Sequence, residues 1–146
     1  MIQCVSGETP GTVFGNLRIR NGIATTGGGM YIDQSSPTLS NCTFTDNSAT
    51  NGGGISSTGN CSPTLTDCTF TDNSADYGGG MYNWDDSNPT LTNCTFTGNS
   101  AETTGGGMYN RNFSNLTLTD CTFTSNSADT RGGGMYNDNS SPATRS

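Results

Sequence analysis

The 146-residue chain contains no lysine and no histidine, and only 29% of its residues are hydrophobic. Twelve acidic residues outweigh five arginines and give a formal net charge of −7. A chain this acidic does not attract nucleic acid or anionic lipid, so we expect neither as a partner. Without histidine or a closely spaced cysteine pair, we expect no metal site and no cofactor.

Long hydrophobic runs are also missing. No segment approaches the roughly 20 apolar residues of a membrane-spanning helix, so we expect no membrane insertion. The N-terminus does not show the charged region and apolar stretch of a secretory signal. The apolar residues that are present recur in fixed columns, which disordered repeats rarely keep. The sequence therefore predicts an ordered repeat.

One pattern is repeated along the chain: a Gly-Gly-Gly triplet, a Pro-Thr-Leu-Thr-like step, a Cys-Thr-Phe-Thr run and then Asn-Ser-Ala. Successive units lie 25–27 residues apart, a period that is typical of stacked repeats rather than of a globular core. The triplets begin at Gly27, Gly52, Gly78, Gly105 and Gly132, and the runs begin at Cys42, Cys68, Cys94 and Cys121.

Polar and apolar residues alternate within two runs of each unit, which predicts strands. In the unit 52–76, Leu65, Cys68 and Phe70 lie on one side and threonines on the other. Asp67 separates the two runs, and Asn or Asp stands there in every regular unit, which predicts a corner. The Gly-Gly-Gly-Met-Tyr segment predicts a third strand. We therefore predict an all-β, single-stranded parallel β-helix (solenoid) with about five coils of 25–27 residues and three short strands per coil.

The odd unit shows which column faces inward, because it has Ile55-Ser56 where the others have Met-Tyr. The Met column stays apolar and is predicted to be interior: Met30, Ile55, Met81, Met108 and Met135. The Tyr column tolerates serine and is predicted to lie mostly outside: Tyr31, Tyr82, Tyr109 and Tyr136. Residues 13–20 align with 38–45 as a degenerate unit, with Phe14, Leu17 and Ile19 in the interior columns.

We expect one domain over 1–146, made of a degenerate first coil (1–26), regular repeats (27–137) and a tail (138–146). Neither end shows an amphipathic capping helix, and an uncapped β-helix exposes a rim of unpaired backbone groups. Two explanations stay open: the chain is a piece of a longer protein, or its ends pair with other copies. The second predicts end-to-end association into a filament.

Two motifs resemble a known family. A Phe-x-x-Asn step paired with a Gly-Gly-x-apolar step is similar to the repeat of polymorphic outer-membrane proteins, and more broadly to right-handed β-helix repeats of bacterial surface and secreted proteins. The resemblance covers residues 13–137 and implies a right-handed solenoid in a secreted or cell-surface protein. The matching steps are Phe44 to Asn47, Phe70 to Asn73, Phe96 to Asn99 and Phe123 to Asn126, with the five triplets.

Cysteine and asparagine columns are predicted to build the interior. Cysteines in adjacent coils would lie about 4.8 Å apart at Cα with parallel Cβ vectors, which favours free, buried thiols over disulfides. Outside that column, Cys61 in a turn and Cys4 in the first coil are the candidates for exposed thiols. The asparagines predict an internal amide ladder: Asn47, Asn73, Asn99 and Asn126.

Outward threonines form the most regular predicted surface. Their T-x-T lattice resembles the faces of β-helical ice-binding proteins, although threonine is also a common residue of any exposed strand. One set is Thr43, Thr45, Thr69, Thr71, Thr95, Thr97, Thr122 and Thr124, and the neighbouring strand carries Thr64, Thr66, Thr90, Thr92, Thr117 and Thr119, beginning with Thr38 and Ser40.

An aromatic column is a second candidate binding surface, since Tyr31, Tyr82, Tyr109 and Tyr136, with Trp84, offer faces for sugar rings. Catalysis is not expected, because the repeat does not group the carboxylates that glycoside hydrolysis uses. We predict a non-catalytic, secreted or cell-surface β-helix with a structural or adhesive role. Ice binding and carbohydrate binding or processing are the alternatives, so the predicted partners are other copies, cell-surface glycans or ice.

Overall fold

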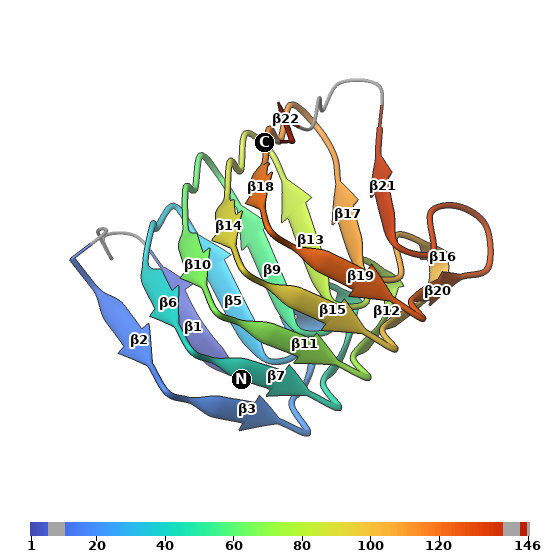
Figure 1. The fold of residues 1–146 in the computed structure, drawn as a ribbon, viewed down its shortest axis with the longest axis horizontal. Helices are drawn as coiled ribbons and strands as arrows, with labels where there is room; N and C mark the ends of the chain where they lie inside the picture. Colours follow the sequence, from blue (N-terminus) through green and yellow to red (C-terminus); the bar gives the residue numbers. More distant parts are fainter. Residues whose placement is uncertain (6–10, 139–143, 146) are drawn as a thin grey trace.

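The computed structural model describes residues 1–5, 11–138 and 144–145. Its regular structure is β throughout, and successive coils stack along one axis so that equivalent strands lie side by side (Figure 1). Among the described residues there is no helix with the length and apolar character needed to cross a membrane. The predicted all-β parallel solenoid is confirmed.

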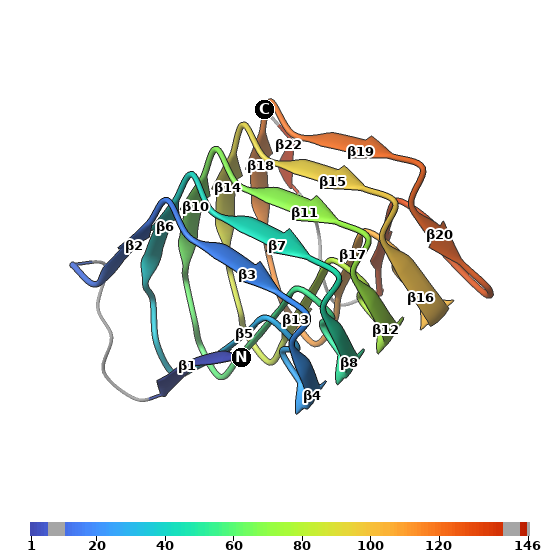
Figure 2. The ribbon, with the colours of Figure 1, turned by 90° about the horizontal axis from the view of Figure 1, so that it is seen from below.

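Four parallel sheets run along the axis, and each coil contributes one strand to each sheet (Figure 2). Sheet A contains β1 (Ile2–Val5), β5 (Met30–Asp33), β9 (Ile55–Thr58), β13 (Met81–Trp84), β17 (Met108–Asn110) and β21 (Met135–Asn137). Sheet B contains β2 (Val13–Gly15), β6 (Thr38–Ser40), β10 (Thr64–Thr66), β14 (Thr90–Thr92), β18 (Thr117–Thr119) and β22 (Thr144–Arg145). Sheet C contains β3 (Arg18–Arg20), β7 (Thr43–Thr45), β11 (Thr69–Thr71), β15 (Thr95–Thr97) and β19 (Thr122–Thr124). Sheet D contains β4 (Ile23–Thr26), β8 (Ser48–Asn51), β12 (Ser74–Tyr77), β16 (Ser100–Thr104) and β20 (Ser127–Ala128).

Sheets A, B and C are the three predicted strands of each coil, and sheet D is an addition. From β8 onward its strands begin at the Ser-Ala pair that follows each ladder asparagine, and β4 begins at Ile23. They have no clear apolar alternation, because one alanine per strand, such as Ala75, faces the narrow interior. The short side chain lets the coil be thin here, and it also removes the sequence signal of a strand.

Like side chains stack in register from coil to coil. Phe44 pairs with Phe70, and Phe70 with Phe96. Their rings are parallel to within 6°, with centroids 4.9 and 4.4 Å apart. The predicted Met column is interior, since Met30, Ile55, Met81 and Met108 are fully buried and Met135 is partly buried.

The amide ladder is confirmed, and the structure contains a second one. Asn73 Nδ2 donates to Asn99 Oδ1 at 2.9 Å and to the carbonyl oxygen of Phe44 at 2.9 Å, so the buried amides are satisfied within the stack. The second ladder lies on the inner face of sheet A, where Asn83 Nδ2 donates to Asn110 Oδ1 at 2.7 Å. Asparagine there follows the Met-Tyr pair, in the third position of the strand.

Left-handed residues make the corners. Asp67, at the predicted corner between sheets B and C, has φ 54°. Between sheets D and A, Gly52 has φ +67°, and a Cβ on Gly53 would lie 2.4 Å from the carbonyl oxygen of Ser74 in the next coil. The triplet is therefore required both for the turn and for the close approach of adjacent coils.

The predictions for two cysteines and one leucine need correction. Cys61 and Cys4 are fully buried rather than exposed. Cys61 sits at an inward-facing corner between sheets A and B, and Cys4 pairs with buried Ile32 in sheet A. Leu17 was predicted to be interior but is 37% exposed. It aligns with Cys42, and the described residues place a further coil on only one side of it.

The predicted tail falls largely outside the described residues, which omit 139–143 and 146. Within its described part, Thr144 pairs with Thr117, so β22 continues sheet B by one more strand.

Candidate functional site

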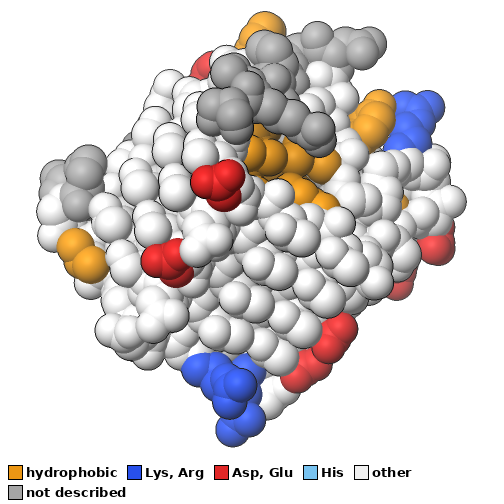
Figure 3. All heavy atoms as spheres, viewed as in Figure 1, with side chains coloured by type: hydrophobic (Ala, Val, Ile, Leu, Met, Phe, Trp, Pro, Cys, Tyr) orange, Lys and Arg blue, Asp and Glu red, His pale blue; other side chains and the backbone are white. Residues whose placement is uncertain are grey.

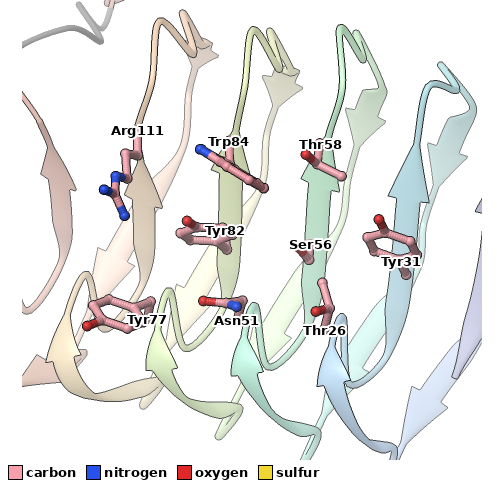
Figure 4. Close-up of a pocket in the computed structure, with 9 residues that line it drawn as sticks. All are labelled: Thr26, Tyr31, Asn51, Ser56, Thr58, Tyr77, Tyr82, Trp84 and Arg111. Atoms are coloured by element: carbon pink, nitrogen blue, oxygen red, sulfur yellow. The ribbon is translucent and has the colours of Figure 1, made fainter.

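A groove on the outer side of the corner between sheets D and A forms a pocket of about 330 Å³. The ends of the sheet-D strands form one side, and outward residues of sheet A form the floor and the other side (Figure 4). The pocket is lined by Thr26, Tyr31, Asn51, Ser56, Thr58, Tyr77, Tyr82, Trp84 and Arg111.

The tyrosines predicted to lie mostly outside are in fact largely covered. They do point away from the coil interior, but Tyr82 and Tyr109 are only 7% exposed. Their rings contact each other with centroids 5.5 Å apart, and Tyr77 from sheet D contacts Tyr109 at 6.0 Å. Sequence reasoning placed these side chains on the correct face. It missed that the glycine corner brings sheet D against that face.

Trp84 belongs to the aromatic surface but not to the tyrosine column. It stands two residues after Tyr82 on β13, at the outer rim of the groove, and is 42% exposed. Figure 4 shows its indole above Tyr82 and beside Thr58. The predicted aromatic set therefore splits: Tyr31, Tyr82 and Trp84 line the pocket, while Tyr109 and Tyr136 continue the column beyond it with centroids 5.6 Å apart.

Serine interrupts the tyrosine column at the pocket. In sheet A, Ser56 pairs with Tyr31 on one side and with Tyr82 on the other. Tyr31 and Tyr82 are thus two coils apart, about 9.6 Å at a strand spacing of about 4.8 Å. Ser56 is 1% exposed and forms the floor of this gap. The Ile55-Ser56 pair, which replaces Met-Tyr and identified the inward column in the sequence, therefore also leaves the space for the pocket.

Hydroxyl and amide groups surround the gap, and charge is confined to its edges. Thr26, Asn51 and Thr58 are partly exposed and offer donors and acceptors to a ligand. Among the nine lining residues Arg111 is the one charged group, and its Nε lies 3.8 Å from Asp138 Oδ2. Both side chains are partly exposed, so solvent screens this ion pair at the border of the groove.

Burial favours the neutral form of the groove tyrosines still further. It raises the pKa of Tyr31, and the nearby carboxylate of Asp33 raises it further. Burial also raises the pKa of Tyr82, although the positive charge of Arg111 opposes that shift. The phenol groups therefore remain hydrogen-bond donors and acceptors at neutral pH.

The predicted threonine lattice is present on sheets B and C. Thr69 pairs with Thr43 and Thr95, and the two columns continue through four coils. This face shows side chains that are mostly neither charged nor hydrophobic, with isolated acidic groups within it and further charged groups nearer its edge (Figure 3). The threonines lie on a face separate from the groove and none of those on sheet C lines it. Ice binding by this lattice stays a prediction.

The cysteine column lies inside the coils. Cys42, Cys68, Cys94 and Cys121 are free thiols, and the first three are 1% exposed or less. Burial raises the pKa of Cys42. Within the described ranges, no group of three or more His, Cys, Asp or Glu side chains is arranged to hold a metal ion.

The coils, the inward ladders and the glycine corners together define a parallel β-solenoid. A family described as the right-handed β-helix region matches residues 2–145, and the chain belongs to this family. No curated protein and no solved structure is similar enough to count as a match.

Proposed function

We propose that this β-helix is a non-catalytic adhesive module of a secreted or cell-surface protein, and that the groove between sheets D and A binds carbohydrate. The observation that carries the proposal is the pocket of about 330 Å³ with aromatic faces on both sides and hydroxyl and amide groups between them. Small-molecule sites have volumes of roughly 300–1,000 Å³ and combine apolar walls with a few polar groups. Sugar rings present the matching chemistry, with apolar C–H faces and hydroxyl edges.

The composition of the lining supports binding rather than cleavage. None of the nine lining residues is a carboxylic acid, whereas glycoside hydrolysis uses a pair of carboxyl groups. The surface location is supported by the resemblance of the Phe-x-x-Asn and glycine steps to polymorphic outer-membrane repeats. A repetitive solenoid also suits adhesion, because it presents one long surface.

Trp84 provides the test, because it is the chain's single tryptophan and lies on the groove rim. Affinity electrophoresis through gels containing neutral polysaccharides (cellulose derivatives, xylan, mannan, β-glucan) should retard the protein. Trp84→Ala should weaken retention about tenfold, equivalent to about 1.4 kcal/mol of lost stacking. Binding should also change the intrinsic tryptophan fluorescence.

Phe113→Ala is the matched control for this substitution. Phe113 is an aromatic residue that is 60% exposed but does not line the groove, so its loss should leave retention unchanged. If no polysaccharide retards the wild-type protein, or if both variants lose retention equally, the groove is not the adhesive site.

A further inference from the structure

We propose that the gap over Ser56 is a slot for a single neutral pyranose ring, which occupies the place of the missing tyrosine. This deepens the proposed function and rests on it, because it names the class of sugar and the residue that admits it. Every other regular coil of sheet A carries tyrosine in this column, at Tyr31, Tyr82, Tyr109 and Tyr136.

The size of the slot follows from the register. Along the column, neighbouring tyrosine rings contact each other, as in Tyr82 and Tyr109 with centroids 5.5 Å apart. Replacing one tyrosine by serine removes one six-membered ring from this row and leaves Tyr31 and Tyr82 as its borders. Figure 4 shows these two side chains on either side of the short side chain of Ser56. A ligand that is one ring wide therefore restores the continuous row.

The groups around the slot select a pyranose over a plain aromatic ring. Ser56 lies at the floor, Asn51 at the sheet-D side and Thr58 at the opposite side, so polar groups face the slot from three directions. An aromatic ring would leave these hydroxyl and amide groups without partners, which costs binding free energy. The equatorial hydroxyls of a pyranose satisfy them while its C–H faces meet the aromatic walls.

Charge selects a neutral sugar over an acidic one. Arg111 is the single cation of the lining, and it already faces Asp138 at 3.8 Å. At the other border Asp33 interacts with the lining residue Tyr31, and the whole chain has a net charge of −7. A uronate would meet the negative charges of Asp33, of Asp138 and of the whole chain, so we expect neutral hexosides to bind more tightly than uronosides.

The decisive variant is Ser56→Tyr, because it restores the residue found in the neighbouring coils and is compatible with the fold. Calorimetric titration should compare methyl glycosides of glucose, galactose, mannose and N-acetylglucosamine, their short oligosaccharides, glucuronic acid and a simple phenol. Ser56→Tyr should reduce affinity for the best neutral sugar at least tenfold. Ser56→Ala, which keeps the slot open but removes the hydroxyl from its floor, should lose a smaller part of the affinity than Ser56→Tyr does.

The outcomes separate the slot from the wider function. If the wild-type protein and Ser56→Tyr bind neutral sugars equally well, the slot is wrong and the groove binds elsewhere. If the wild-type protein binds no sugar at all, the proposed function itself fails. If glucuronate or the phenol binds more tightly than the neutral sugars, the proposal that the slot takes a neutral pyranose is overturned. Circular dichroism and the unfolding midpoint of Ser56→Tyr, expected to equal those of the wild type, show that any loss arises at the slot.

Discussion

Phe113 is the residue whose backbone fits its side chain least well. It has φ 64° at the corner between sheets A and B, where the corresponding corners use Asn60 and Asp86. The left-handed region costs a residue with a bulky side chain about 1–2 kcal/mol, and asparagine relieves much of that cost. Phe113→Asn should therefore raise the free energy of unfolding by about 1 kcal/mol in chemical denaturation.

The control for this prediction is Phe113→Ala, which removes the exposed ring but keeps a Cβ. It should give little of the gain, because alanine also disfavours positive φ. Equal stabilisation by alanine and asparagine would show that ring exposure, rather than backbone conformation, is responsible.

Corner residues were predictable from composition in one column and overlooked in another. The Asn/Asp column that includes Asp67 predicted a left-handed corner, and its φ of 54° confirms it. The corner between sheets C and D is occupied by Asp46, Asp72, Gly98 and Ser125, all with φ between 53 and 66°. Asp, Gly and Ser in one column carry the same signal. The two aspartates of this column could be mistaken for cation ligands. The glycine and serine at the same position show that the column is selected for its left-handed backbone.

At the scale of the element, the asparagine ladder that includes Asn73 and Asn99 is expected to be a main source of stability. Asn99 Oδ1 accepts from both the backbone N–H and the side-chain amide of Asn73, and its Nδ2 donates to Phe70. Asn99→Ala leaves these buried groups without partners, so the free energy of unfolding should fall by at least about 2 kcal/mol.

Thr97→Val is the control for the ladder, because Thr97 lies on the adjacent strand but points outward and valine is a good strand residue. Chemical denaturation should show a change of no more than about 0.5 kcal/mol for it. A loss of similar size in both variants would mean that any change in this coil is destabilising, and that the ladder has no special role.

Elements with periodic sequence were predictable, and the element without periodicity was not. Sheets B and C alternate polar and apolar residues, and sheet A keeps an apolar Met or Ile column, so their strands and these inward columns followed from the pattern. Sheet D turns one alanine inward per coil, as with Ala75 and Ala101, and its remaining residues vary. The groove depends on sheet D. The tyrosines were therefore assigned to the correct face, but their burial was not predicted.

For the whole molecule, alkaline pH should weaken the fold. Burial raises the pKa of the Cys42 and Cys61 thiols. In the unfolded chain a thiol loses its proton above about pH 8.5, while the folded state still holds it. The unfolded state then binds fewer protons, so stability is fully present below about pH 8.5 and falls as the pH rises through the folded-state values.

Denaturation midpoints between pH 7 and 10 test this dependence. Cys61→Ser is the matched variant, because Ser35 and Ser87 occupy the same position in other coils. Above pH 8.5, the denaturation midpoint of Cys61→Ser should fall less steeply with pH than the midpoint of the wild-type protein. A midpoint that stays constant or rises over this range would show that the buried thiols do not control the response.

The interruption at Ser56 has a consequence for how such proteins diversify. Each coil occupies about 4.8 Å of the axis, so the coil that carries the serine sets the height of the slot along the molecule. A single codon change in another coil would create a second slot at a known distance, and duplication of one unit would move the slots apart in fixed steps. If the proposed carbohydrate function holds, the order of serines and tyrosines along the solenoid therefore sets the spacing between sugar slots along an extended glycan.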